Sequence, residues 1–339
     1  MTNLELIAKL AGVSRGTVDR VLHNRGQVRP ETEEKVRAVM QELDFQPNAL
    51  GRAFYLSRKK NKIGILVAFR EPDFQKQVMQ GVNEGVVYAQ QHGVEVLIEY
   101  AHPDDTEGYL ASLRRLLDGG VRGLAIRGVL SDEIDRCLRE ISREQMQIVV
   151  YNEDIRDKGL RDCFVGQDSC RAGACAACLM EQIAGPGGEM LLVGVDARHV
   201  SSEERLNGFA EYFRKRGTDV SHVIYGKGSH ELTYRQTRDM IAAREHISGI
   251  FVSGAGLSGA AHAVDDAGLT GRIKVVGFDI TESNMSFLKK GTVQFLIDQG
   301  PYMQGYRSVQ LLTEAIFRDT AVETSFVDTG IQIKNPYNC

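Results

Sequence analysis

Residues 10–22 read LAGVSRGTVDRVL, and this stretch decides the fold of the first part of the chain. Gly12 supplies the left-handed residue that ends a first helix, and Ser14 can cap a second helix with its side-chain oxygen. Val18, Val21 and Leu22 give the second helix one apolar face. The pattern predicts a helix-turn-helix, whose second helix enters the major groove of DNA. An ordinary helical hairpin is the alternative, because such hairpins are common.

A third helix and a short connecting segment follow this motif. Pro30 lies where a helix can begin, because its missing N–H costs nothing at the first helical position. Pro47 ends that helix, since the residue before a proline disfavours helical geometry. Residues 48–56 can form a helix too short to be stable alone, and residues 57–62 are a basic linker. We therefore expect an all-α headpiece over residues 1–46, and a hinge helix with its linker over residues 47–62.

Charge is divided unevenly along the 339 residues. Residues 1–62 carry a net charge of +5 and the remainder a net charge of −9. A basic head on an acidic body favours a nucleic-acid contact confined to the head. The first residues form an amphipathic helix rather than a leader peptide, and no apolar run is long enough to cross a bilayer. We expect a cytoplasmic protein without a membrane partner, associated with the nucleoid when bound to DNA.

From Ile63 onwards the pattern changes to alternating strands and helices. A strand at 63–69 precedes a helix at 75–92 and a strand at 94–100, and similar runs recur up to residue 278. This alternation predicts an α/β body with parallel, doubly wound sheets, and about ten strands exceed one typical sheet. We expect two lobes within residues 63–339 and a ligand in the cleft between them. The expected N-lobe is about 63–164 and 295–325, and the expected C-lobe is about 165–294 and 326–339.

Six cysteines raise the question of a metal site. Cys175 and Cys178 lie in an Ala-rich helical run, close to Cys163 and Cys170. No histidine or second CxxC pair stands nearby at zinc-ligand spacing. In a reducing compartment we expect these side chains to be buried structural thiols, with no metal and no cofactor.

The whole chain resembles the LacI/GalR family of bacterial transcription regulators. In the head, the resemblance rests on residues that match the family signature in order and spacing: Leu10-Ala11-Gly12-Val13-Ser14, Thr17-Val18, Arg20-Val21-Leu22, Val28, Glu31-Thr32, Lys35-Val36, Glu42-Leu43 and Pro47-Asn48-Ala49. The body resembles type I periplasmic sugar-binding proteins, closer to the ribose-binding branch. The resemblance implies a sequence-specific DNA-binding regulator, predicted to be a repressor, that is controlled by a small molecule and has no enzymatic activity.

The resemblance also implies which residues contact DNA. Arg15, Gly16 and Arg20 would face the base edges, where Arg20 would be directed to a guanine and Gly16 would allow a close approach without reading a base itself. Asp19 replaces a phosphate-contacting serine of the family, so it would repel the backbone or accept from a cytosine amino group. The full set of implied DNA-contacting residues is Ser14, Arg15, Gly16, Thr17, Asp19, Arg20, Asn24, Gln27, Arg29, Thr32, Asn48, Gly51 and Phe54.

Residues 48–56 resemble the family's hinge helix. Phe54 stands where the family usually has a leucine that wedges into the minor groove, and an apolar wedge is a known means of kinking DNA. Gly51 replaces a usual alanine and lowers helix propensity by about 1 kcal/mol, which makes the helix more dependent on DNA. The alternative for Phe54 is apolar filling between head and body.

Effector contacts are implied by resemblance to the sugar-binding proteins. Arg205 would donate to sugar oxygens, Asp279 would accept from hydroxyls and Gln299 would do either, which suits a polyol. Gly254 and Glu153 depart from the family's polar residues at these positions. The full set of implied effector-contacting residues is Arg70, Phe74, Arg127, Asn152, Glu153, Arg205, Gly254, Asp279 and Gln299. Arg70 and Arg127 add charge, so we expect a sugar or sugar acid other than ribose. A structural ion pair is the alternative for Arg205 and Asp279.

Two other functions compete with this interpretation. Gly254, Gly256 and Gly259 form a GxGxxG between a strand and a helix, with Asp279 25 residues after the first glycine, as in nicotinamide-dependent dehydrogenases. Such a motif normally opens the first βαβ unit of its domain, and here it lies late in the chain. A stand-alone solute-binding protein would lack the basic head. We therefore predict a homodimer that binds a pseudo-palindromic, double-stranded operator and couples that site to the effector.

Overall fold

The computed structural model describes residues 3–22, 28–42, 61–141, 146–185, 187–197, 199–217, 220 and 222–339. The chain divides into two compact units, residues 1–59 and residues 60–339. Among the described residues, no helix is both long enough and apolar enough to span a membrane.

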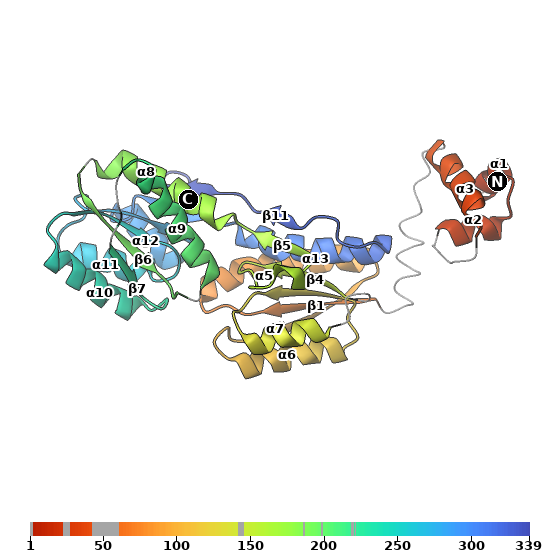
Figure 1. Cartoon of the computed structure of the whole chain (residues 1–339), viewed down its shortest axis with the longest axis horizontal. Helices are drawn as coiled ribbons and strands as arrows, with labels where there is room; N and C mark the ends of the chain where they lie inside the picture. Colours follow the sequence, from red (N-terminus) through yellow and green to blue (C-terminus); the bar gives the residue numbers. More distant parts are fainter. Residues whose placement is uncertain are drawn as a thin grey trace. The chain divides into compact units, whose positions relative to one another are not determined.

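The described part of the first unit folds into the helices α1 (Asn3–Ala11), α2 (Arg15–Leu22) and α3 (Pro30–Glu42) (Figure 1). Their shared core is formed by buried side chains that include Ile7, Val18 and Val36. Gly12 has a φ of +67°, and the backbone N–H of Thr17 donates to Ser14 Oγ over 3.1 Å. The glycine therefore ends α1 and the serine caps α2, so the predicted helix-turn-helix is confirmed.

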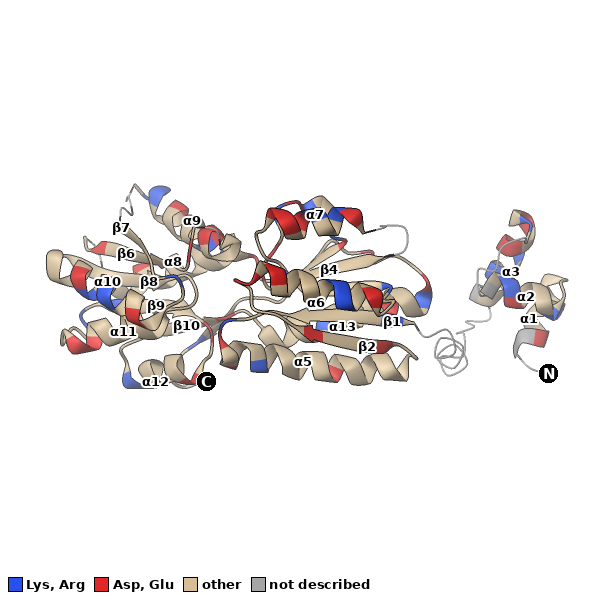
Figure 2. Cartoon of the chain, turned by 90° about the horizontal axis from the view of Figure 1, so that it is seen from below, with Lys and Arg blue, Asp and Glu red and all other residues tan. Residues whose placement is uncertain are grey.

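The first sheet of the second unit has the strand order β11-β5-β4-β3-β1-β2, with all strands parallel. Ile65 in its centre pairs with Ile98 on one side and Ala125 on the other. The strands are β1 (Lys62–Val67), β2 (Glu95–Tyr100), β3 (Gly123–Arg127), β4 (Gln147–Tyr151), β5 (Cys163–Gly166) and β11 (Phe326–Asp328). Most strand residues are uncharged, as burial on both faces requires (Figure 2).

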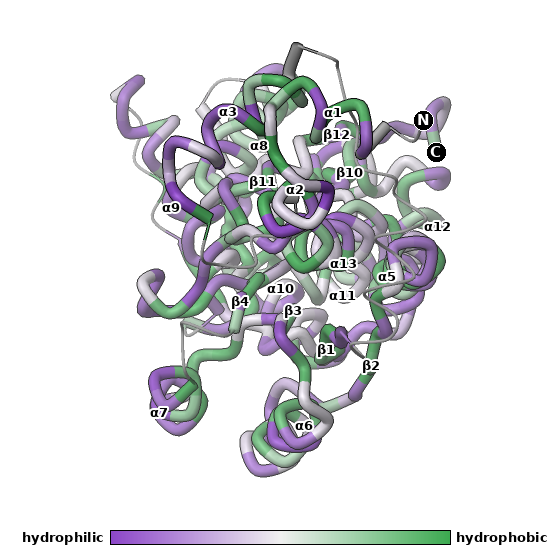
Figure 3. Tube along the Cα trace, turned by 90° about the vertical axis from the view of Figure 1, so that its right-hand side faces the viewer, coloured by the Kyte–Doolittle hydropathy of each residue, from purple (hydrophilic) through white to green (hydrophobic). Residues whose placement is uncertain are grey.

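Four helices cover the two faces of this sheet. Helices α5 (Pro72–Gln91) and α13 (Pro301–Arg318) enclose one apolar core, and α6 (Thr106–Asp118) and α7 (Asp132–Glu140) enclose the other. Both α6 and α7 carry hydrophobic and hydrophilic residues, as expected of helices with one buried face (Figure 3). A short 3₁₀ helix, η1 (Lys158–Leu160), precedes β5.

The second sheet has the order β12-β10-β9-β8-β6-β7, and only β12 is antiparallel. Its strands are β6 (Glu189–Gly194), β7 (His222–Tyr225), β8 (Ile247–Val252), β9 (Lys274–Phe278), β10 (Phe295–Asp298) and β12 (Gln332–Lys334). Helices α8 (Ser169–Ala184) and α9 (Val200–Arg214) cover one face. Helices α10 (His230–Ala243), α11 (Leu257–Asp266) and α12 (Glu282–Lys290) cover the other.

The expected lobe boundaries are wrong near the C-terminus. Residues 295–298 were expected in the N-lobe but pair as β10 in the second sheet, and residues 326–328 pair as β11 in the first. The chain therefore crosses between the lobes after β5, after β10 and between β11 and β12. The Gln167 side chain joins these crossings, because its Nε2 donates to the carbonyls of Asp298 and Gly330 over 3.2 and 2.9 Å.

Candidate functional site

The face of α2 that is expected to contact DNA is largely exposed. Arg15, Gly16 and Arg20 are exposed, whereas Thr17 and Asp19 are half-buried. A Cβ at Gly16 would meet only Ser14 Oγ, at 3.7 Å, so the helix surface is open at this position. The backbone of α2 can therefore approach a groove closely at Gly16, and Arg15 and Arg20 provide one guanidinium group on each side of this glycine.

The remaining expected DNA contacts are only partly described. Arg29 is exposed and Thr32 is half-buried at the start of α3, where the Thr32 N–H donates to the Arg29 carbonyl over 2.9 Å. The other expected contacts, Asn24, Gln27, Asn48, Gly51 and Phe54, lie outside the described residues. The hinge helix and the Phe54 wedge thus stay predictions.

Two residues with left-handed backbone mark the cleft between the lobes of the second unit. Asn152 follows β4 with a φ of 65°, and Asp279 follows β9 with a φ of 75°. Non-glycine residues rarely adopt this conformation, and such strain gathers at ligand sites. Each backbone N–H donates to the neighbouring strand over 3.1 Å, Asn152 to Val165 and Asp279 to Ile297. The sheets therefore hold both side chains at the carboxyl ends of their strands.

A chain of hydrogen bonds joins five of the expected effector residues. Arg127 Nε donates to Asn152 Oδ1 over 3.2 Å, and Asn152 Nδ2 donates to Gln299 Oε1 over 3.4 Å. Arg205 Nη2 donates to the same Gln299 oxygen over 2.9 Å. Gln299 Nε2 donates to Asp279 Oδ1 over 2.6 Å. The side chains that the resemblance implied are therefore brought together, and they come from both lobes.

Arg205 is the most constrained member of this chain. Its side chain is 3% exposed, and its guanidinium carbon lies 4.0 Å from the centroid of the Phe278 ring. Nη1 donates to the Ser253 carbonyl over 2.9 Å, whereas the buried Nε has no partner. Because buried donors are almost always paired, Nε is a donor available to a ligand oxygen.

A close helix contact fixes the backbone of Arg205. A Cβ at Gly173 on α8 would lie 2.0 Å from the Arg205 carbonyl oxygen on α9. A Cβ at Gly208 would likewise lie 2.0 Å from the Cys170 carbonyl oxygen. These glycines let α8 and α9 pack backbone against backbone, so the position of Arg205 depends on them.

The Asp279 carboxylate accepts a hydrogen bond from the Gln299 side-chain amide and has no direct hydrogen bond to Arg205. Burial raises the pKa of its carboxyl to about 6, against the opposing effects of Arg205 and of the Gln299 hydrogen bond. None of the ion pairs among the described residues joins Arg205 to Asp279, since Gln299 lies between them. A direct structural ion pair is therefore not the role of these two residues.

Glu153 joins the lobes beside this chain. Its carboxylate is 6% exposed and accepts from the N–H of Ser201 over 3.2 Å and from the Ser201 hydroxyl. Burial opposes ionisation, but His199, Arg127 and the Ser201 hydroxyl hold the pKa of Glu153 below its ordinary value. Burial lowers the pKa of His199 to about 4, with Glu153 acting in the opposite direction, so this imidazole is neutral at pH 7.

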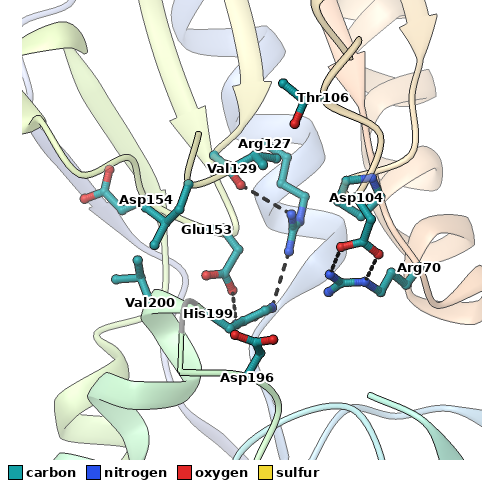
Figure 4. A pocket seen from close by; sticks show the side chains of 13 residues that line it. Arg70, Asp104, Thr106, Arg127, Val129, Glu153, Asp154, Asp196, His199 and Val200 are labelled. Carbon is teal, nitrogen blue, oxygen red and sulfur yellow. Dashed lines mark hydrogen bonds and ion pairs between the residues drawn. The ribbon is translucent and has the colours of Figure 1, made fainter. Parts of the chain in front are cut away.

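A pocket of about 230 Å³ opens beside these groups (Figure 4). Arg70 donates two hydrogen bonds to Asp104, one of them from Nε over 2.6 Å, and Arg127 lies against His199 at 3.5 Å. Two arginines line the pocket together with the carboxylates of Asp104, Glu153, Asp154 and Asp196. The carboxylates therefore outnumber the arginines in the pocket lining, although Arg70 and Arg127 were expected to make the pocket positively charged.

Two of the expected effector residues have other surroundings. Phe74 is 5% exposed and packs in the core of the first lobe, 5.2 Å from Phe69 between ring centroids. Phe69 instead lies under the Arg127 guanidinium, with 5.6 Å between the guanidinium carbon and the ring centroid. Gly254 is buried, and a Cβ there would lie 3.0 Å from Val195 and 4.0 Å from Arg205 Nη1. This glycine leaves space beside the arginine.

Sequence reasoning missed several cleft residues. Asp104, Asp196, His199 and Ser201 directly follow strands or open a helix at the carboxyl edge of a sheet. That position is the signal that could have found them. Gln304 carried no such signal, because it faces Asn152 from the first turns of α13, where Asn152 Nδ2 donates to its Oε1 over 3.1 Å.

The glycine motif at 254–259 packs two helices together. Gly256 has a φ of +105° at the start of α11, and a Cβ there would lie 2.6 Å from Thr233 Oγ1. A Cβ at Gly259 would lie 2.3 Å from the His230 carbonyl oxygen on α10. The small residues are thus required by the contact of α11 with α10, which does not favour the dehydrogenase hypothesis.

The cysteines differ in part from the expectation. Cys163 is buried, and burial raises the pKa of its thiol to about 11. Cys175 and Cys178 are only half-buried and Cys170 is exposed, because the face of α8 that carries them is not fully covered. In the part of the chain that is described, no three His, Cys, Asp or Glu side chains are grouped to hold a metal ion.

Comparison with known proteins gives two matching domains. Residues 3–48 match the domain described as bacterial regulatory proteins, lacI family, and residues 63–318 match the periplasmic binding protein domain. The ribose operon repressor of Halalkalibacterium halodurans is 25% identical over 329 residues, which cover 93% of this chain and 91% of the relative. The lactose operon repressor of Escherichia coli is 25% identical over 312 residues, which cover 91% and 83%.

Solved structures share the fold of the body. A carbohydrate transporter solute binding protein from Agrobacterium radiobacter, in complex with D-arabinose, is 23% identical and has a TM-score of 0.71. The superposition covers 82% of this chain and 95% of that protein. A solute binding protein from Burkholderia graminis, also in complex with D-arabinose, is 20% identical with a TM-score of 0.73, covering 82% and 96%.

Proposed function

Because the chain belongs to the lacI family of bacterial regulatory proteins and carries a periplasmic binding protein domain, we propose that it is a homodimeric repressor released or recruited by a neutral sugar. Members of this family are DNA-binding regulators rather than enzymes, and this chain is one of them.

The DNA-binding part of the proposal rests on α2. Arg15 and Arg20 are exposed at its two ends, and Gly16 removes the side chain that would hold the helix away from the bases. Arginine pairs with guanine edges in the major groove, whereas Ser14 and Thr17 suit phosphate contacts. Two such heads need two half-sites, so a pseudo-palindromic operator is proposed.

The effector part rests on one observation, the hydrogen-bond chain from Arg127 to Asp279 together with the unpartnered Nε of Arg205. Amide, guanidinium and carboxyl groups arranged in series offer the paired donors and acceptors that a polyol requires. Relatives and solved structures point in the same direction, since their names include a ribose operon repressor and D-arabinose complexes. We therefore propose a pentose-like or hexose-like effector.

The charge of the pocket favours a neutral effector over a sugar acid. Arg70 is bound to Asp104, and Arg127 lies against Asn152 and His199 with Glu153 close by. Both arginines are thus already opposed by carboxylates, and an added anion would face Asp104 and Asp196. A pocket of about 230 Å³ is also smaller than the roughly 300–1,000 Å³ that drug-sized ligands occupy, which suits a monosaccharide.

The coupling proposed here acts through the lobes. Glu153 and Ser201 link them on one side, and the three crossings joined by Gln167 link them on the other. An effector that binds between the lobes favours one interlobe arrangement over the other, which is how binding at one site biases a second. In a dimer, a change in the interlobe arrangement alters the distance between the two heads and therefore their fit to the two half-sites of the operator.

A thermal-shift series tests the effector class. The full chain is heated with pentoses, hexoses, polyols, sugar acids and sugar phosphates, since a ligand of the folded state raises the melting temperature. We expect a neutral monosaccharide to give a concentration-dependent rise that is lost in Arg205→Gln. A rise with sugar acids or sugar phosphates alone would contradict the proposal.

A further inference from the structure

A second and larger groove includes Ser201, the partner of Glu153, in its lining. Its volume is about 790 Å³, and it is lined by residues of both lobes. The first lobe contributes Asp162, Phe164 and Phe326, and the second contributes Asp168, Cys170 and Glu204. The effector pocket and this groove share only Asp154 and Val200 in their linings.

The charges of this groove are unevenly compensated. Asp154 accepts from Arg161 Nε and Nη2 over 2.7 and 2.8 Å, and Lys158 lies 3.9 Å from it, so both cations of the groove are bound to one carboxylate. The lining also contains the carboxylates of Asp162, Asp168 and Glu204, so acidic side chains outnumber basic ones by four to two. The groove therefore carries net negative charge from both lobes.

Among the carboxylates of the groove, Glu204 lacks both an ion pair and a side-chain hydrogen bond within the described residues. It is half-buried on α9. Burial raises the pKa of its carboxyl, and the nearby Glu153, Asp154 and Asp168 act in the same direction while Lys158 opposes them. Asp168, by comparison, caps α8 through the N–H of Arg171 over 2.9 Å.

A buried acceptor without a partner, Gln167 Oε1, gives evidence for a ligand that is independent of the carboxylates. Gln167 lines the groove and is 4% exposed, and its Nε2 is bound to two carbonyls of the crossings. Its Oε1 is buried and has no partner. Buried acceptors of this kind are rare in proteins, and the matching group is an N–H donor.

The groove also has an aromatic wall. The rings of Phe164 and Phe326 are stacked with centroids 6.0 Å apart and planes inclined by 6°. Phe326 remains 42% exposed, and the Arg161 guanidinium already lies 5.5 Å from the Phe164 ring. An exposed ring beside carboxylates suits a ligand with methylene groups and a positive charge.

We propose that this groove is a second ligand site, which binds an organic diamine or polyamine through Glu204, Asp168 and Gln167. Ammonium groups donate to the two carboxylates and to Gln167 Oε1, while the methylene chain lies on Phe326. The groove shares Asp154 and Val200 with the effector pocket, and Asn152 of the effector hydrogen-bond chain also lines it, but the proposed amine contacts are made by other residues and do not depend on the identity of the sugar. Because it is built from both lobes and contacts the hinge, its occupant biases the interlobe arrangement and thereby the response to the effector.

Calorimetry on the full chain tests the site with putrescine and spermidine at constant ionic strength. We expect saturable binding by the unaltered chain and at least tenfold weaker binding by Glu204→Gln. The matched control is Glu231→Gln, which removes the same charge from an exposed position on α10 outside the groove. Equal weakening in both variants, or no saturable heat for either amine, would overturn the proposal.

Alkylation of Cys170 gives a second readout. This thiol is exposed and lines the groove. In a Cys339→Ser background, which removes the other exposed cysteine of the described residues, the rate of Cys170 modification by iodoacetamide is followed by mass spectrometry. Spermidine is expected to slow it severalfold in the unaltered groove but not in Glu204→Gln. Unchanged rates at a saturating amine concentration would place the amine elsewhere and contradict the assignment.

Discussion

The carboxylate of Glu153 in the first lobe accepts from both the N–H and the hydroxyl of Ser201 in the second lobe. Glu153 is 6% exposed, and Ser201 is also 6% exposed at the start of α9. Hydrogen bonds to a buried carboxylate are stronger than neutral ones, and breaking one partner leaves the charge unsatisfied. This contact therefore holds the lobes together in the arrangement described.

Substitutions at this contact should be strongly coupled. Ser201→Ala removes the hydroxyl but keeps the N–H, so we expect a loss of about 1–3 kcal/mol in unfolding free energy. Glu153→Gln keeps the shape but removes the charge that opposes Arg127. A double-mutant cycle from urea unfolding is expected to give an interaction energy above about 0.5 kcal/mol. Simple additivity would show that the two side chains do not interact in solution.

Two buried groups should make opposite contributions to the pH dependence of stability. The pKa of Asp279 is raised from 3.8 to about 6, so the folded state binds more protons between these values and stability falls as pH rises. The pKa of His199 is lowered from 6.5 to about 4, so stability rises with pH over that window. Each contribution is on the order of 3 kcal/mol, and the two nearly cancel.

Single variants separate these contributions. Relative to the unaltered chain, Asp279→Asn should gain stability as pH rises from 4 to 6, and His199→Asn should lose it. Unfolding in urea at pH 4, 5, 6 and 7 measures both slopes. Parallel stability curves for all variants would show that neither group is perturbed as described.

A glycine pair distinguishes general packing from placement of Arg205. A Cβ at Gly173 would lie 2.0 Å from the Arg205 carbonyl oxygen, and one at Gly81 would lie 1.9 Å from the Tyr302 carbonyl oxygen. Both Gly→Ala variants should lose about 1–3 kcal/mol of stability, because overpacking forces backbone shifts. Only Gly173→Ala should also weaken sugar binding, as measured by calorimetry below the melting temperature. Equal sugar affinity in both variants would show that Arg205 does not contribute to effector binding.

Recognition by α2 predicts two kinds of DNA-binding defect. Arg20→Ala should cost about 1–3 kcal/mol on the preferred operator and relax the choice of base at one position in each half-site. Thr17→Ala should weaken binding to all sequences by a similar factor, because phosphate contacts carry no direct sequence information. Binding of each variant to a set of single-base operator changes distinguishes them. Loss of affinity without altered base preference in Arg20→Ala would contradict base readout.

Local chemistry made the head predictable from the sequence. Gly12 and Ser14 act within one turn of the backbone, so their roles follow from residue type and spacing. The alternation of strands and helices likewise predicted the two sheets, except for their short strands β11 and β12. β11 and β12 have three residues each, which is too little sequence for a pattern, and their placement depends on which sheet edge they reach.

The details of the cleft depend on contacts between distant residues. Resemblance placed Arg205, Asp279 and Gln299 together, but the amide bridge between the first two arises only when α9 meets the end of β10. Phe74 was expected at the cleft because the resemblance to sugar-binding proteins placed it at an aromatic wall position, yet α5 turns it into the core and leaves Phe69 beside Arg127. Helix rotation of this kind is set by packing rather than by local sequence.

On the proposed function, a sugar in the cleft controls DNA binding by the head. An operator selected from a randomised pseudo-palindromic pool allows the affinity of the full chain to be measured with and without the sugar found by thermal shift. We expect the sugar to change operator affinity at least fivefold, and the change to disappear in Arg205→Gln. A sugar that raises the melting temperature of the unaltered chain but leaves its operator affinity unchanged would contradict the account.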